Sequence, residues 1–275
     1  MMRALAFAAL LVSSCARAED VKPVKDAGPY VPSPQSVVSD MLRHADVGPA
    51  DFVIDLGSGD GRIVLTAAKV FGARGFGVEI KDELVTRSNA AAMNEGLADR
   101  VKFIKQDLFK TDISQATVVT MYLLPDTVNL LKDKFLAELR PGTRIISHDY
   151  PLTGWIPEKY VQMDLEDKVQ ISGVTTTLIY LYVVPAKVAG NWSARMPPAV
   201  SKAPATLSLR QQLTRVSGSL RLDGKDVPLE DVKLRGDRLS FKVAGRKGEY
   251  TGQIKGKLIE GTFDGKTAWS ATLGS

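Results

Sequence analysis

The clearest chemical signal in this sequence is a glycine-rich run, VIDLGSGDGR, whose first residues form an apolar stretch of buried-strand length. Its members of interest are three glycines and two acids: Gly57, Gly59, Gly61, Asp55 and Asp60. Because glycine lacks a Cβ, such a run lets the backbone approach a ligand closely and adopt dihedrals that other residues avoid. Open α/β sheets also bind ligands at the carboxyl ends of their strands. The run therefore predicts a ligand-binding turn between a strand and a helix.

The two acids indicate which ligand this turn would bind. A site for the pyrophosphate of a dinucleotide favours the spacing G-x-G-x-x-G, whereas this run reads G-x-G-x-G with an acid between its last two glycines. Asp55 and Asp60 would repel a pyrophosphate, but they suit a sulfonium cation and the ammonium group of an amino acid. We therefore expect S-adenosyl-L-methionine as the cofactor.

Further acids follow the next two predicted strands. Glu79 ends the second strand, 22 residues beyond Gly57, where a carboxylate can accept hydrogen bonds from both ribose hydroxyls. Asp107 follows the third strand and is placed to accept from an adenine amino group, with Leu108 and Phe109 beside it as apolar contacts for the base. Three acids at the ends of three successive strands predict one shared cofactor site.

Two side chains at the same edge are candidates for the chemistry of transfer. Methyl transfer to nitrogen is an in-line displacement, which needs alignment of the reactants more than a strong base. Tyr122 ends the predicted fourth strand and is placed to orient an acceptor, with a core tyrosine as the alternative. His148 follows the fifth strand, and a pKa near neutrality suits it to receive the released proton, with a structural histidine as the alternative.

The elements that would position these residues alternate along the chain. Strand-like runs occupy 52–56, 75–80, 101–106, 116–123, 143–147 and 175–184, and helical character marks 36–44, 63–71, 83–95 and 129–139. Strands that alternate with helices of this length favour a parallel sheet covered on both faces. We predict an α/β fold with a Rossmann-like, doubly wound, mostly parallel sheet.

A second, smaller domain is expected towards the C-terminus. Residues 191–206 hold three prolines among small residues and indicate a linker. From 207 to 275, short alternating segments are separated by turn signals such as Asp-Gly, which is typical of about six antiparallel strands. We predict a cofactor-binding domain at 19–190 and a small antiparallel β domain, a barrel or sandwich, at 207–275.

The first 18 residues have the order of a secretory signal peptide. Arg3 precedes an apolar run over 4–12, and Ala16-Arg17-Ala18 ends the segment in an A-x-A pattern. In an alternative interpretation, Cys15 belongs to a bacterial lipobox and becomes acylated. Both interpretations predict export to the periplasm or envelope, with no transmembrane segment in the mature chain because the apolar run is too short to span a bilayer.

The composition argues against two kinds of partner. One cysteine and two histidines give little material for a metal site, so none is expected. The net charge of +5 arises in the last part of the chain, where residues 201–275 hold 14 Lys and Arg against 8 Asp and Glu, while residues 1–200 carry a net charge of −1. We therefore expect no nucleic acid at the cofactor-binding domain.

The motifs DLGSGDGR, GVEI and KQDLF resemble the first three motifs of class I S-adenosylmethionine-dependent methyltransferases, over about residues 30–185. More narrowly, PYVPS ahead of VIDLGSGDGRIVLTAA resembles a small family of mitochondrial protein-lysine methyltransferases, which modify the c-type subunit of ATP synthase and the adenine nucleotide carrier. The resemblance implies that a Tyr30 segment folds over the cofactor and that the turn at 121–125 lies near the acceptor amine. It also implies a protein substrate, membrane-associated as in that family.

N-methylation of a protein lysine is the function that these residues and the resemblance together predict. The turn at 121–125, MYLLP, lacks the Asn/Asp-Pro-Pro-Tyr signature of enzymes that methylate nucleobases or glutamine. One alternative is a methyl acceptor that is a small molecule or lipid. Another is an exported binding module whose Rossmann-like domain binds the cofactor without catalysis. Aminopropyl transfer is disfavoured, because Asp126 is the only acid after the fourth strand that could hold a polyamine.

Overall fold

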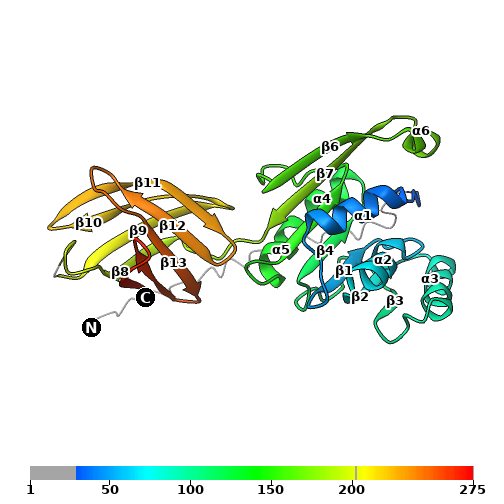
Figure 1. The fold of residues 1–275 in the computed structure, drawn as a ribbon, viewed down its shortest axis with the longest axis horizontal. Coiled ribbons are helices and arrows are strands. Elements are labelled where there is room, and N and C mark those ends of the chain that lie inside the picture. Colours follow the sequence, from blue (N-terminus) through cyan, green and yellow to red (C-terminus); the bar gives the residue numbers. More distant parts are fainter. Residues whose placement is uncertain (1–28, 202, 275) are drawn as a thin grey trace, which may run out of the picture.

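The computed structural model describes residues 29–201 and 203–274, which form an α/β part and a closed β-barrel. The two parts lie side by side and are joined where the sheet of the α/β part leads into the first strand of the barrel (Figure 1). The predicted signal segment 1–18, with Cys15, lies outside the described residues. In the part of the chain that the structure describes, no helix is long and apolar enough to cross a membrane.

The α/β part is built on a seven-stranded sheet with the order β3-β2-β1-β4-β5-β7-β6. Its strands are β1 (Phe52–Leu56), β2 (Arg74–Glu79), β3 (Val101–Lys105), β4 (Val118–Met121), β5 (Arg144–His148), β6 (Lys159–Asp164) and β7 (Thr176–Val183). β1 to β5 are parallel, whereas β7 runs antiparallel to β5 and β6 antiparallel to β7. The strand order reverses at β1, so ligands are expected in the crevice at its carboxyl end.

Helices cover both faces of this sheet. They are α1 (Gln35–His44), α2 (Arg62–Phe71), α3 (Asp82–Asn94), α4 (Pro125–Leu130), α5 (Lys132–Glu138) and α6 (Glu166–Ser172). Successive residues of a strand point to opposite faces, so Val53 packs with side chains of α1 and α2, while Ile54 packs with side chains of α4 and α5. The predicted Rossmann-like, doubly wound fold is confirmed. The structure adds β6 and α6, and it divides the helix predicted at 129–139 into two short ones.

The barrel closes on itself in the order β10-β11-β12-β13-β14-β15-β8-β9. Its strands are β8 (Gly190–Arg195), β9 (Ala205–Gln212), β10 (Arg215–Leu222), β11 (Lys225–Arg235), β12 (Arg238–Val243), β13 (Tyr250–Lys255), β14 (Leu258–Phe263) and β15 (Thr267–Leu273). Four large aromatic side chains lie in the interior: the rings of Phe241, Tyr250 and Trp269 are in mutual contact, and Trp192 is buried in the same core. Closure leaves no open sheet edge, which is how small barrels avoid edge-to-edge aggregation.

The structure corrects the linker predicted at 191–206. Gly190–Arg195 is a barrel strand that pairs with β9 and with β15, so the β domain begins near residue 190 rather than at 207. Prolines follow this strand, and they are the reason why the whole of 191–206 was predicted to be a linker. What makes it a strand is its pairing with the last strand of the chain, and Trp192 is fully buried as a result.

The barrel joins the α/β part at the amino-terminal edge of the parallel strands. Because β7 runs antiparallel to β5, its last residue, Val183, pairs with Arg144 at the start of β5. Just beyond, Ala186 N donates to Gly236 O at 2.8 Å, and Leu213 packs against the core of the α/β part. The barrel therefore sits at the edge opposite the carboxyl ends of β1, β2 and β4.

Candidate active site

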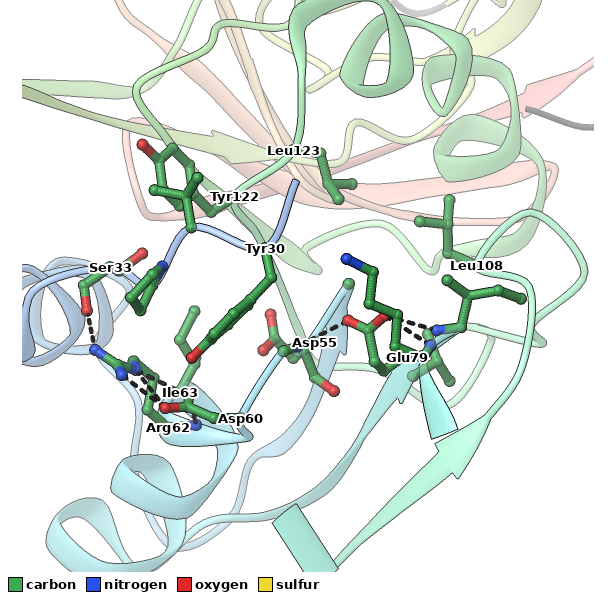
Figure 2. Close-up of a pocket in the computed structure, with 18 of the residues that line it drawn as sticks. Tyr30, Ser33, Asp55, Asp60, Arg62, Ile63, Glu79, Leu108, Tyr122 and Leu123 are labelled. Carbon is green, nitrogen blue, oxygen red and sulfur yellow. Dashed lines mark hydrogen bonds and ion pairs between the residues drawn. The ribbon is translucent and has the colours of Figure 1, made fainter. Parts of the chain in front are cut away.

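A cavity of about 380 Å³ opens at the carboxyl ends of β1, β2 and β4. Its walls are residues 29–33, which we term the lid segment, the glycine-rich turn 57–60, the end of β2, the loop 106–109 and the residues after β4. The residues predicted for the site that line it are Tyr30, Asp55, Gly57, Gly59, Asp60, Glu79, Asp107, Leu108 and Tyr122. Figure 2 shows Tyr30 and Asp60 on one side of this cavity and Glu79 and Leu108 on the other. Gly61 and His148 do not line it.

The glycine-rich turn depends on close approaches that only glycine permits. At Gly59 φ is +53°, and a Cβ there would come within 2.5 Å of the Tyr30 ring. At Gly61 φ is +82°, and a Cβ there would come within 2.6 Å of the Phe103 ring. Gly59 thus lets the lid segment close over the turn. Gly61, predicted to bind the cofactor, instead lets the start of α2 pack against β3.

Asp60 and Arg62 tie the lid segment to the turn. Arg62 Nη2 donates to Asp60 Oδ2 at 2.6 Å, and Arg62 Nη1 donates to the Ser33 carbonyl at 2.7 Å. Burial acts to raise the pKa of Asp60, but hydrogen bonds and charge from Arg62 outweigh it and lower that pKa. Burial and the nearby Asp60 carboxylate raise the pKa of the Tyr30 hydroxyl. Asp60 is therefore a carboxylate that anchors the lid segment through Arg62 and also lines the cavity.

Asp55 is fully buried at the end of β1 and keeps one oxygen unsatisfied. Its Oδ1 accepts a hydrogen bond from Thr120 Oγ1 at 2.6 Å, whereas Oδ2 has no partner among the described residues. Burial, opposed by this hydrogen bond and reinforced by the charges of Glu79 and Asp60, raises the pKa of Asp55 to about 7. An unsatisfied buried carboxylate oxygen is costly, so a donor or cationic group of a ligand would stabilise the site.

Glu79 and Asp107 are held at the ends of the neighbouring strands by backbone amides. Glu79 Oε2 accepts from Gly59 N at 3.0 Å, and its Oε1 accepts from Ile80 N at 2.8 Å. Asp107 Oδ1 accepts from Phe109 N at 2.9 Å, which closes a local turn. Both carboxylates are thereby fixed beside the cavity, where they can accept from ligand hydroxyl and amino groups.

Tyr122 lines the cavity after β4, and the His148 ring packs against it, tilted by 34°, with the two ring centroids 4.0 Å apart. His148 is fully buried, and its Nδ1 shares a 2.8 Å hydrogen bond with Ser33 Oγ of the lid segment. Burial lowers the pKa of His148 to about 4. The structure therefore gives no support to the predicted role of His148 as the proton acceptor, because the ring lies outside the cavity and its neutral form is a weak base.

Known proteins with similar sequences decide the family. The ANTKMT methyltransferase domain matches residues 55–159. A protein-lysine N-methyltransferase of Saccharolobus islandicus (strain REY15A) is 43% identical over 157 residues, which make up 57% of this chain and 93% of that protein. The chain belongs to the ANTKMT methyltransferase family.

Two further relatives cover the same methyltransferase domain. A Xenopus laevis lysine N-methyltransferase, named for the c-type subunit of ATP synthase, is 34% identical over 130 residues, or 47% of this chain and 57% of that protein. A crystal structure of an RNA methyltransferase from Salinibacter ruber in complex with S-adenosyl-L-homocysteine is 43% identical with a TM-score of 0.52, and the match covers 57% of this chain and 96% of that one. The chain thus spans nearly all of the Saccharolobus and Salinibacter proteins but little more than half of the Xenopus one.

S-Adenosylmethionine is the cofactor of this methyltransferase, and the residues of the cavity fit it. The unsatisfied Oδ2 of Asp55 suits the cationic amino-acid end of the molecule. Glu79 and Asp107 offer fixed acceptors for ribose hydroxyls and an adenine amino group, and Leu108 adds an apolar wall. Since a Cβ at Gly59 would strike Tyr30, the turn also needs glycine there for the lid to close over a ligand.

Arg62 and Ser33 also line the cavity, and neither was predicted from the sequence. Arg62 had a local signal, because a guanidinium two positions after Asp60 at the start of a helix is placed to form an ion pair. Ser33 had none. Its oxygens contact Arg62 and His148, which lie 29 and 115 residues away along the chain.

Proposed function

We propose that this methyltransferase transfers the methyl group of S-adenosylmethionine to the side-chain amine of a lysine in a protein. The observation that carries the proposal is the 43% identity to the Saccharolobus protein-lysine N-methyltransferase over 93% of that protein's length. The Xenopus relative, whose name also specifies a protein lysine, supports the same acceptor chemistry.

The residues around the cavity suit transfer to an amine. When bound, the cofactor supplies an electrophilic methyl group. A lysine ammonium must lose a proton before its nitrogen can attack, and a site poor in water lowers the pKa of that ammonium because burial disfavours the charged form. The lid segment closes one side of the cavity, and Leu108 and Leu123 line it with apolar surface. Alignment of the amine beside Tyr122 would then supply much of the reduction in the barrier.

Transfer to RNA is a second candidate, because the Salinibacter relative is named an RNA methyltransferase. The charge of the part that holds the methyltransferase domain argues against an RNA substrate, since residues 1–200 carry a net charge of −1. The turn MYLLP after β4 argues against it too, since it lacks the Asn/Asp-Pro-Pro-Tyr signature. The basic surplus at 201–275 is the feature that favours it.

A labelling experiment separates these acceptors. The full chain is incubated with S-adenosyl-[methyl-³H]methionine and a lysate from the source cells, which is then divided into membrane protein, other protein, RNA, and lipid with small molecules. We expect label in protein, recovered as methyl-lysine after hydrolysis, and none with Gly59→Val, whose fold is checked by circular dichroism. Label in RNA or lipid alone would contradict the lysine proposal and leave the methyltransferase assignment intact. Tight cofactor binding with no labelled fraction would favour a binding module.

We further propose that the chain is exported to the periplasm or envelope and that its substrate is membrane-associated. The order of residues 1–18 supports export, and the membrane-protein substrates of the family it resembles support the second point. A fusion of residues 1–30 to a reporter that is active only after export tests the first. We expect an active reporter and a mature N-terminus at Glu19 or at an acylated Cys15. An intact Met1 or Met2 in the native protein would contradict export, and label confined to non-membrane protein would contradict the second point.

A further inference from the structure

Ser33, the last residue of the lid segment, forms hydrogen bonds on two sides. Its hydroxyl shares a 2.8 Å bond with Nδ1 of His148, which ends β5. Its carbonyl accepts from Nη1 of Arg62, the first residue of α2, at 2.7 Å, and Figure 2 shows this bond. Ser33 is 4% exposed, so both bonds are shielded from water. The lid segment is therefore tied at its last residue to a helix and to a strand.

The lid segment is a stiff arm that leaves α1. Pro32 and Pro34 flank Ser33, and each ring fixes its own φ and disfavours a helical conformation in the residue before it. α1 begins directly after Pro34 and is held in place by its buried apolar face. Three residues before Ser33, the ring of Tyr30 lies against Gly59 of the glycine-rich turn. The bonds at Ser33 therefore set the direction in which the arm carries Tyr30.

The surroundings of His148 indicate which group donates in its bond to Ser33. His148 is fully buried, and its Nε2 has no hydrogen-bond partner among the described residues. Asp149 Oδ1 lies 3.5 Å from this Nε2, and Lys168 Nζ holds the carboxylate at 2.8 Å from each oxygen. A ring hydrogen on Nε2 faces the carboxylate, which favours the tautomer with no hydrogen on Nδ1. The Ser33 hydroxyl is then the donor and His148 Nδ1 the acceptor.

We propose that His148 is a positioning residue that latches the lid segment over the cofactor cavity through Ser33. The His148 ring packs against Tyr122, with the two centroids 4.0 Å apart, so it holds Ser33 from a fixed place. While the hydroxyl bond is made, the arm directs the Tyr30 ring onto the glycine-rich turn. Without it, only the bond from Arg62 holds Ser33, and the arm turns away from the cavity.

A latched lid bears on the reaction itself. A closed lid excludes water and fixes the geometry of the reacting groups. This role differs from the proton-accepting one predicted for His148, since the ring acts through Ser33 and touches neither reactant. It concerns the lid and the cofactor, and it does not depend on which acceptor is methylated.

The direct test follows the lid segment by ¹⁹F NMR in the full chain labelled with 3-fluorotyrosine. Tyr30→Phe removes one resonance and so assigns it. Ser33→Ala deletes the hydroxyl alone and should shift or broaden the Tyr30 resonance, because the arm loses one of its two bonds. Ser36→Ala, an exposed serine on α1, is the matched control and should leave that resonance in place.

A pair of variants separates the hydrogen bond from the packing of the ring. His148→Asn and His148→Gln both remove the ring that packs against Tyr122. The amide of asparagine lies near the former place of Nδ1 and can still bond to Ser33, whereas glutamine carries its amide towards the former place of Nε2. We expect the Tyr30 resonance to keep its position in His148→Asn and to move in His148→Gln as it does in Ser33→Ala. Equal positions in the two folded variants would overturn the latch.

The second readout is methyl transfer from S-adenosyl-[methyl-³H]methionine at saturation, counted as total label in the lysate so that the result holds for any acceptor. In Ser33→Ala we expect turnover to fall about fivefold, the size of effect that one hydrogen bond contributes. Affinity for S-adenosylhomocysteine should stay within about twofold of the wild type, since a lid acts mainly on the reacting geometry. An unmoved Tyr30 resonance in Ser33→Ala, or full turnover in a variant whose resonance has moved, overturns the proposal. If the wild type labels no fraction, the ¹⁹F positions alone decide whether His148 holds the lid.

Discussion

The ring of Tyr30 lies against the backbone of Gly59, so closely that a Cβ on Gly59 would come within 2.5 Å of Tyr30 Cε2. On its other side Gly59 N donates to Glu79 Oε2 at 3.0 Å. Gly59 of the glycine-rich turn thus contacts both the lid segment and the acid that ends β2. We expect a substitution in one of the three to affect the position of the other two.

Gly59→Ala should displace the lid. The new methyl group occupies the place of the Tyr30 ring, and φ at +53° adds strain of about 1–2 kcal/mol for a non-glycine residue. We expect a lower melting temperature and reduced turnover.

Tyr30→Ala should lower kcat more than cofactor affinity, because a lid acts mainly on the reacting geometry. In the double variant the ring is gone, so the turnover losses should not add. Additive losses would show that the two residues act independently.

Glu79→Ala should weaken binding of S-adenosylmethionine by about 1–3 kcal/mol, because ribose hydroxyls lose a charged acceptor and the turn loses its anchor at Gly59. Glu79→Gln keeps an oxygen acceptor and should cost less. Glu83→Ala, an exposed acid on α3, is the control and should leave affinity unchanged. Calorimetry on the three variants measures this. Equal affinity in wild type and Glu79→Ala would remove Glu79 from the site.

Asp55 should make both stability and ligand binding depend on pH. Its pKa is raised to about 7 from an ordinary 3.8, so between these values the folded protein binds more protons than the unfolded chain. The ligand-free protein should therefore lose stability as pH rises from about 4 to 7, with no further loss from this group above that. Affinity for S-adenosylhomocysteine, which brings an ammonium, should rise over about pH 6–8, by at most about tenfold per unit. Asp55→Asn should flatten both profiles in thermal melts and calorimetry. An unchanged pH profile in that variant would show that another group titrates.

Limited trypsin digestion should cut after Lys202 and leave the two fragments together. The neighbouring residues Pro198, Ala199 and Pro204 are exposed, which favours cleavage. This segment joins β8 to β9, so both fragments contribute strands to one closed barrel. We expect two bands on a denaturing gel and one peak in size-exclusion chromatography. Two separate peaks would contradict the assignment of β8 to the barrel. Cleavage inside residues 55–185 before cleavage at Lys202 would contradict the expected order of digestion.

The cavity and the acids that line it were predictable from sequence because these residues obey one local rule. Asp55, Glu79 and Asp107 each follow an apolar run of strand length, and parallel strands bring their carboxyl ends to one edge of a sheet. The hydrophobic periodicity of the helices and the length of the apolar strand runs also predicted the doubly wound fold, because a strand that is buried on both faces has a continuous apolar pattern. The barrel was predicted only in part. Its first strand is short and beside prolines, and ring closure joins Trp192 to Leu273 across most of the domain.

By itself, the sequence determined the α/β fold, the cofactor and the place of three acids beside one cavity, because these depend on periodicity and on spacing within single strand-turn-helix units. Only the tertiary structure decided how the acceptor side is built. Ser33 meets His148 over 115 residues of chain, and Lys168 from α6 meets Asp149 over 19. Burial, which follows from packing and not from residue type, lowers the pKa of His148 to about 4 and keeps the ring outside the cavity, so the structure gives no support to the proton-accepting role that its ordinary pKa suggested.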